Sequence, residues 1–189
     1  MNKNYETILP EGYREAFVVD AKDRKTIIGM NIAATAFTVL GIIAVILIYR
    51  PSYDDIFSWR YFAAFAGLML YLVLHELTHG LVYKFMTGRK LTFGLSFSVA
   101  YCGVPDIFVY RKTAVMSLLA PFIVFDILYG IGALALPLVI DRCFCAILLM
   151  IHAGGCVGDL YDTWLYLTRF RDPSVLMKDT GPKQTFYVK

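Results

Sequence analysis

The chain has 189 residues, of which 58% are hydrophobic and only 17% are charged, and its net charge is +3. A soluble domain carries about 25% charged residues, so this composition excludes an ordinary soluble globular protein. The basic residues form no dense run, which excludes nucleic acid as a partner. The four cysteines show no CxxC spacing, so we expect buried, inert thiols and neither a zinc ribbon nor a secreted disulfide framework.

Four long apolar blocks dominate the chain, and each is long enough to cross a bilayer as a helix of about 20 residues. They follow a polar N-terminal segment, residues 1–25, which we expect to be cytosolic and partly helical. The predicted spans are 26–49, 61–86, 113–140 and 142–167, which together form a transmembrane domain over 26–168. Residues 169–189 predict a cytosolic tail.

The placement of lysine and arginine predicts the orientation of these spans. Five basic residues lie in the N-terminal segment, five in the connection between the second and third spans when the end of the second span is counted with it, and five in the tail. The other three, Arg50, Arg60 and Arg142, fall on the opposite side. Positive charge marks the cytosolic side of a membrane protein. We therefore expect a multi-pass protein of the cell membrane with both termini in the cytosol.

The connection between the second and third spans has a pattern of its own. From Leu91 to Tyr101 the odd positions are Leu, Phe, Leu, Phe, Val and Tyr, and the even positions are small or polar. This alternation predicts a β-strand. A second short run, Ile107–Tyr110, follows a turn-forming segment, Gly103–Asp106. The sequence thus predicts an all-α membrane protein with four transmembrane helices and a short cytosolic β-hairpin between helices 2 and 3.

A metal-binding motif, His75-Glu76-Leu77-Thr78-His79, lies toward the cytosolic end of the second span. On a helix, positions i and i+4 share one face, so His75 and His79 can bind a single ion. Glu76 lies one residue along, where it can hydrogen-bond a water on that ion. Two histidine ligands with a carboxylate base are the zincin arrangement. Ionisable residues inside a membrane helix are costly and mark functional interiors, which favours a metal site over a structural polar cluster.

A catalytic zinc takes three protein ligands and leaves one position for water. No histidine or glutamate follows His79 at a zincin spacing, so the third ligand must come from elsewhere, and the fourth span supplies candidates. Asp159, among small residues, is our choice. His152, two turns earlier on the same face, is an alternative ligand or a group that polarises the substrate carbonyl. Asp162, one turn after Asp159, is a further candidate that we interpret as a solvated carboxylate.

Other polar and small residues of the spans also have predicted roles. Asp126, in the third span, either orients a metal-binding histidine or pairs with a polar neighbour. Glycines in the fourth span, Gly154, Gly155 and Gly158, would allow close approach to the metal-bearing helix. We expect the span tyrosines, Tyr83 among them, to pack or to lie at the membrane interface.

Taken in order along the chain, these segments resemble the putative zincin peptidases, small multi-pass proteins distantly similar to site-2 proteases. The resemblance rests on the HELTH motif at 75–79, on Tyr101-Cys102-Gly103-Val104-Pro105, on Leu118-Leu119-Ala120-Pro121 and on a late Gly158-Asp159. In site-2 proteases the third zinc ligand is an aspartate on a later membrane helix, which implies Asp159 here. Leu160 follows Asp159, where those enzymes have glycine.

These observations predict a membrane-embedded zinc metalloendopeptidase with Zn²⁺ as its cofactor. Its metal ligands would be His75, His79 and Asp159, its general base Glu76, and His152 would stabilise the oxyanion. The partners would be the lipid bilayer and a membrane-associated protein or peptide, held extended by the 91–101 strand. Iron or manganese would also suit these ligand types. The alternatives are a non-hydrolytic membrane metal-binding protein and a catalytically silent scaffold.

Overall fold

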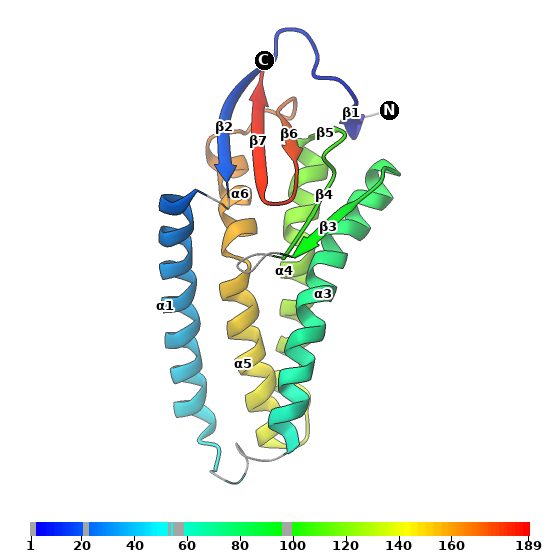
Figure 1. The fold of residues 1–189 in the computed structure, drawn as a ribbon. Helices are drawn as coiled ribbons and strands as arrows, with labels where there is room; N and C mark the ends of the chain where they lie inside the picture. Colours follow the sequence, from blue (N-terminus) through cyan, green and yellow to red (C-terminus); the bar gives the residue numbers. More distant parts are fainter. Residues whose placement is uncertain (1–2, 21–22, 53, 55–58, 96–99) are drawn as a thin grey trace. The chain divides into compact units, whose positions relative to one another are not determined.

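A computed structural model describes the whole chain except residues 1–2, 21–22, 53, 55–58 and 96–99 (Figure 1). Most of the described residues are helical. The helices are α1 (Arg24–Tyr49), α3 (Trp59–Thr87), α4 (Arg111–Ala135), α5 (Val139–Gly155) and α6 (Val157–Thr168). The strands are β1 (Tyr5–Glu6), β2 (Arg14–Asp20), β3 (Thr92–Leu95), β4 (Ala100–Gly103), β5 (Phe108–Tyr110), β6 (Leu176–Asp179) and β7 (Lys183–Val188).

Three of the described helices, α1, α3 and α4, are long and apolar enough to cross a membrane, and α5 with α6 makes a fourth span only if the broken pair is counted as one. The predicted third span runs too far, because α4 ends at Ala135. Pro137 explains this end, since a proline disfavours helical conformation at the residue before it and cannot donate a backbone hydrogen bond. The predicted fourth span is interrupted at Cys156, the residue that caps α5.

Segments from both ends of the chain form a five-stranded sheet of order β1-β5-β6-β7-β2. Strand β2 pairs antiparallel with β7, from Arg14 opposite Val188 to Asp20 opposite Lys183. The expectation of a partly helical N-terminal segment is therefore wrong. Its strand buries Val19 in the core, and β-branched and aromatic residues favour a pleated, half-buried surface. Beside its helices the protein thus has a sheet that an all-α description omits.

The predicted hairpin differs from the observed strand pairing. Strand β3 pairs antiparallel with β4, from Thr92 opposite Gly103 to Leu95 opposite Ala100, so the stretch predicted as one strand supplies both partners. Residues 96–99 of that stretch lie outside the described residues. The second predicted run does form a strand, β5, but its partners are β1 and β6. The period-two pattern predicted extended backbone correctly. The predicted pairing of the two runs was wrong, because the register of a strand depends on partners far away in the chain.

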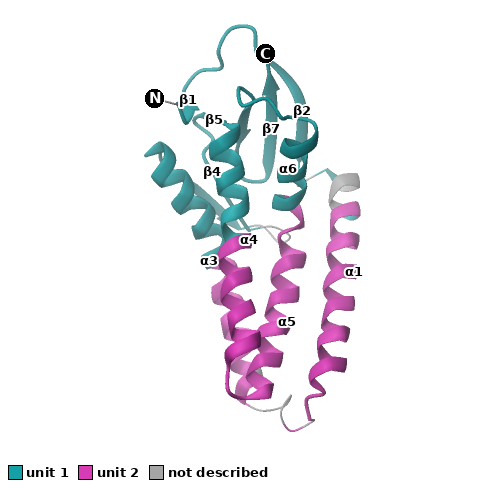
Figure 2. Ribbon diagram, turned by 180° about the vertical axis from the view of Figure 1, so that it is seen from behind, with its two compact units in different colours: residues 1–28, 74–121, 159–189 teal, residues 29–73, 122–158 magenta. Residues whose placement is uncertain are grey.

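The chain divides into two compact units (Figure 2). Unit 1 comprises residues 1–28, 74–121 and 159–189, and unit 2 comprises residues 29–73 and 122–158. The core of unit 1 joins the sheet to α3, α4 and α6 through side chains such as Val109, Tyr166 and Phe186. Unit 2 consists of helical segments, with a smaller core around Cys143 and Ala146.

Candidate metal centre

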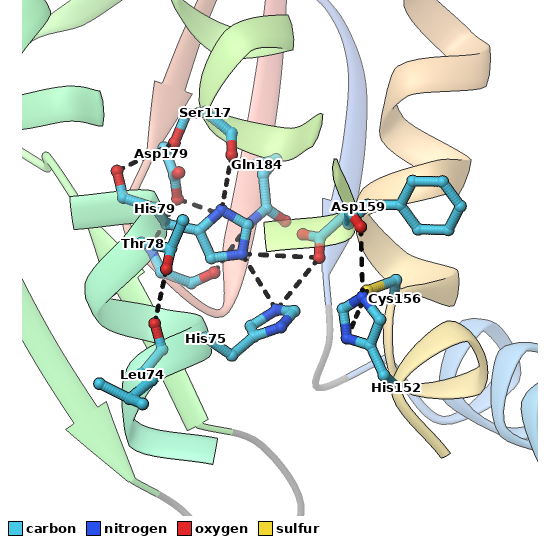
Figure 3. A network of polar contacts seen from close by, with 12 residues as sticks. Leu74, His75, Thr78, His79, Ser117, His152, Cys156, Asp159, Asp179 and Gln184 are labelled. Carbon is cyan, nitrogen blue, oxygen red and sulfur yellow. Dashed lines mark hydrogen bonds and ion pairs between the residues drawn. The ribbon is translucent and has the colours of Figure 1, made fainter. Parts of the chain in front are cut away.

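Helix α3 presents His75 and His79 on one face, and Figure 3 shows their rings turned toward one another. The two Nε2 atoms lie 3.2 Å apart. This approach follows from the four-residue spacing, which places the side chains one helical turn apart. Both residues are buried, at 8% exposure each. Glu76 follows His75 on the same helix and is partly exposed.

Asp159, in the first turn of α6, completes a three-atom group with the two histidines. Its Oδ2 atom lies 3.4 Å from His75 Nε2 and 3.5 Å from His79 Nε2. All three residues belong to unit 1. The structure therefore brings together the three ligands that the sequence reasoning chose, from positions 75 to 159 in the chain.

The donor set of this group fits a zinc ion. A tetrahedral ion with metal–ligand bonds of about 2.0–2.1 Å separates its ligand atoms by about 3.3–3.4 Å. The three observed separations, 3.2, 3.4 and 3.5 Å, match those edges. Two imidazole nitrogens and one carboxylate oxygen are also ligands that zinc accepts, and three protein ligands leave a fourth position for water or substrate.

A hydrogen bond to α4 fixes the orientation of the His79 ring. The Nδ1–H of His79 donates to the carbonyl oxygen of Ser117 at 2.9 Å, since a carbonyl can only accept. The proton on Nδ1 leaves Nε2 of the neutral ring with a free lone pair directed at His75 and Asp159. The Ser117 hydroxyl donates in return to the His79 carbonyl at 3.3 Å. One residue of α4 thus holds both the ring and the backbone of a predicted ligand.

A buried carboxylate, Asp179 of β6, lies near the same turn of α3. It accepts a hydrogen bond from the Tyr83 hydroxyl at 2.6 Å and is only 4% exposed. Burial raises the pKa of Asp179 to about 6, although its hydrogen bonds act in the opposite direction. Burial, together with the charge of Asp179, likewise raises the pKa of Cys102 to about 12, so this cysteine is an inert thiol as expected.

The β3–β4 pair packs against α3 at Gly80, the residue directly after His79. A Cβ atom at this position would lie 2.8 Å from the ring of Phe93, 3.1 Å from Leu91 and 3.2 Å from the Cys102 sulfur. Glycine therefore lets two strands lie directly on the turn of α3 that carries His79. The fourth-span glycine Gly154 has another role than predicted, since its neighbours are Thr38 and Ala34 of α1.

His152 lies in unit 2, in a polar cluster of its own. Its Nδ1 atom is 2.8 Å from the Tyr71 hydroxyl, and its Nε2 atom is 3.5 Å from both the Phe122 carbonyl and Asp126 Oδ1. The Cys156 sulfur is 3.6 Å from Nδ1. Of the two readings of Asp126, the structure shows the pairing with a polar neighbour. The oxyanion role of His152 stays a prediction.

Asp162 is not the solvated carboxylate that we interpreted it to be. It is only 3% exposed, because the face of α6 that carries it also carries Tyr166, a residue of the unit 1 core. Its Oδ1 atom and the Tyr166 hydroxyl have no hydrogen-bond partner among the described residues. Its carboxylate is not part of the three-atom group that Asp159 forms with the histidines.

A comparison with protein families matches residues 68–173, more than half of the chain, to the family described as "Putative zincin peptidase". The chain belongs to this family. The match contains all three residues of the metal group and the Glu76 position. Searches for similar curated proteins and for similar solved structures gave no match.

Sequence reasoning missed two residues next to the metal group of this zincin family member. Ser117 acts on His79 through its backbone carbonyl, which every residue type carries, so no sequence signal marks it. Asp179 lies outside the family match, in the segment that we expected to be a cytosolic tail and for which we predicted no strand. Tyr83 was expected only to pack; its position four residues after His79 was the available signal.

Proposed function

We propose that the protein is a zinc-dependent metallopeptidase that hydrolyses peptide bonds of membrane or membrane-associated proteins. One observation carries the proposal. Two histidine nitrogens and one carboxylate oxygen converge at 3.2–3.5 Å in a buried site, and they do so beside a glutamate in a His-Glu-x-x-His helix. Family membership supports the same reaction class.

Each residue of the site then has a distinct role. A zinc ion held by His75, His79 and Asp159 would supply a Lewis acid that polarises the scissile carbonyl and acidifies a water molecule. Glu76 accepts the proton from the attacking water and delivers it to the leaving amine. Ser117 keeps the His79 ring in the tautomer that ligation requires.

The β3–β4 pair supports a substrate bound in extended form. In this two-stranded sheet β3 pairs with β4 alone among the described strands, so its other edge is available for strand addition. Phe93 and Leu95 on β3 are 50% and 83% exposed, and Gly80 brings this strand pair directly onto the turn of His79. An extended peptide exposes the carbonyls that a helix would hide, which peptide hydrolysis requires.

The five-stranded sheet supports a four-span topology with both termini on the cytosolic side. Strand β2 precedes α1, β5 lies between α3 and α4, and β6 and β7 follow α6, yet all belong to one sheet. A sheet cannot lie on both sides of a bilayer, so this order supports a chain that crosses and returns twice. The α5–α6 pair then acts as one broken span. Fifteen of the eighteen basic residues fall on this side, the cytosolic one.

Hydrolysis of fluorescein-labelled casein by the detergent-purified protein tests the proposal. Wild type is expected to cleave it, to lose activity to a chelator and to regain it with Zn²⁺. The Glu76→Gln variant, which keeps the metal ligands, is expected to bind zinc normally and to cleave at least ~100-fold more slowly.

Two results would contradict the proposal. One is a Glu76→Gln variant that cleaves casein as fast as wild type, since contaminating protease would then explain the activity. The other is a folded wild type that binds no zinc. A Glu11→Gln variant, altered at an exposed glutamate of the N-terminal segment, is the matched control and should cleave like wild type.

A further inference from the structure

The turn between β6 and β7 holds a carboxylate in the interior of unit 1. Asp179, at the end of β6, is 4% exposed. Its Oδ1 atom accepts a hydrogen bond from the Gly181 backbone at 2.8 Å and another from the Gln184 amide at 3.4 Å. Its Oδ2 atom accepts from the Tyr83 hydroxyl at 2.6 Å. Two partners thus come from its own hairpin and one from α3.

The bond to Tyr83 reaches the metal-binding part of α3. Tyr83 lies one helical turn after His79 and is 1% exposed, so both side chains lie on the same face of the helix. The Asp179 carboxylate also interacts electrostatically with His79 and with Glu76. A negative charge that acts on His79 also attracts a cation bound there.

A second contact ties the same hairpin to the strands that cover the metal turn. The backbone N–H of Val104, directly after β4, donates to the Asp179 carbonyl at 3.0 Å. Gly181 has a φ of +94°, a left-handed conformation that favours glycine, and the ring of Tyr101 on β4 packs directly on it. Both the side chain and the backbone of Asp179 therefore contact the surroundings of His79.

We propose that Asp179 and Tyr83 are a positioning pair for the metal centre, through which the C-terminal hairpin β6–β7 sets the affinity of the site for zinc. The inference rests on the proposed function, since it assumes that His75, His79 and Asp159 hold the metal. It adds to the site a segment, residues 174–189, that the family match at 68–173 does not contain.

The choice of a carboxylate at this buried position points to a role beyond packing. An asparagine would place an NH2 group, which can only donate, at one of the two positions that accept hydrogen bonds here, whereas a carboxylate accepts at both but carries a charge that is costly to bury. Burial raises the pKa of Asp179 to about 6, so its ionised form is costly to keep in the fold. A bound metal ion would explain why this costly negative charge is kept, because the carboxylate would balance part of the positive charge of the ion.

Metal affinity of the full-length, detergent-purified protein tests this inference. Zn²⁺ affinity would be measured by competition with a chromophoric chelator, and ligand geometry by the visible absorption of bound Co²⁺. The test variants are Tyr83→Phe, which removes only the hydroxyl, and Asp179→Asn, which removes the charge and replaces one acceptor oxygen with an NH2 group. Tyr13→Phe is the matched control, because its hydroxyl likewise donates a hydrogen bond within unit 1, in this case to the backbone carbonyl of Ser174 at 2.9 Å.

We expect both test variants to bind Zn²⁺ about tenfold more weakly, the low end of the range for residues that orient metal ligands, and to shift the Co²⁺ spectrum. Tyr13→Phe should change neither. Wild-type affinity and an unchanged spectrum in both folded test variants would overturn the inference and leave the peptidase proposal standing. A wild type that binds neither ion would overturn both. If Asp179→Asn fails to fold, Tyr83→Phe alone decides between these outcomes.

Discussion

The protein contains two clusters that place a histidine and an aspartate among apolar helices, and they differ in what their polar atoms face. In unit 1, the Nε2 atoms of His75 and His79 and the Oδ2 atom of Asp159 face one another at 3.2–3.5 Å. In unit 2, the two ring nitrogens of His152 face a tyrosine hydroxyl and a backbone carbonyl.

This difference separates a metal centre from a structural network. When both histidine Nε2 atoms are unprotonated, the three converging lone pairs repel one another, and a cation relieves that repulsion. A hydroxyl and a carbonyl, in contrast, satisfy the imidazole of His152 directly, although Asp126 Oδ1 beside it has no hydrogen-bond partner among the described residues. Residue type alone does not distinguish the two clusters, since both contain histidine and aspartate. The direction of each nitrogen lone pair distinguishes the two clusters.

The largest expected effect compares the aspartates of the two clusters. Asp159→Asn should weaken Zn²⁺ binding by more than 100-fold, because it removes a charged ligand. This loss of affinity is larger than the ~10–100-fold loss that is typical when a residue that orients a ligand is changed. Asp126→Asn should leave affinity within a factor of about two, since its neighbour is His152. Chelator competition measures both. Equal losses in the two variants would contradict the distinction between the clusters.

The next prediction concerns the stability of unit 2. His152→Ala should lower the free energy of unfolding by about 2–4 kcal/mol, because it leaves a cavity and an unpartnered Tyr71 hydroxyl in a buried site. Thermal unfolding in detergent measures this, with zinc content determined on the same sample. We expect destabilised protein that keeps its metal. A stable variant that has lost zinc would show that His152 serves the metal centre.

The pH dependence of stability tests the buried carboxylate of unit 1. The folded-state pKa of Asp179, about 6, lies above the ordinary value of an aspartate, 3.8, so the carboxyl contributes most to stability below pH ~4 and this contribution is lost as pH rises to about 6. The loss is on the order of 2–3 kcal/mol. The metal-free Asp179→Asn variant should lack this pH-dependent loss of stability. Parallel unfolding curves for the two proteins from pH 4 to 7 would contradict the assignment.

The smallest expected effect is at the contact between α3 and the β3–β4 pair. Gly80→Ala should cost about 1 kcal/mol of stability, because the new methyl group presses on Phe93, Leu91 and Cys102. Gly67→Ala, on the same helix with no heavy atom within 4 Å of the added Cβ, is the control and should not destabilise the protein. Equal melting temperatures of Gly80→Ala and wild type would argue against close packing at this turn.

The sequence could predict features that depend on residues close together in the chain, and it could not predict features that depend on residues far apart in the chain. The metal motif on α3 is local, so spacing alone predicted that His75 and His79 meet. The apolar blocks were predicted for the same reason. Strand β2 could not be placed, since its partner β7 lies at the other end of the chain and strand pairing depends on nonlocal register. Burial of Asp162 and Asp179 also arises from tertiary packing, which no residue pattern near them reveals.

The most direct test of the account is the zinc content of the detergent-purified protein, compared between wild type, His79→Ala and His152→Ala. We predict nearly one zinc per chain in wild type and in His152→Ala, and almost none in His79→Ala, because His79 presents a nitrogen to the converging group of unit 1 and His152 is not a member of that group. Zinc retained in folded His79→Ala, or absent from folded wild type, would contradict the metal centre and the peptidase function proposed from it.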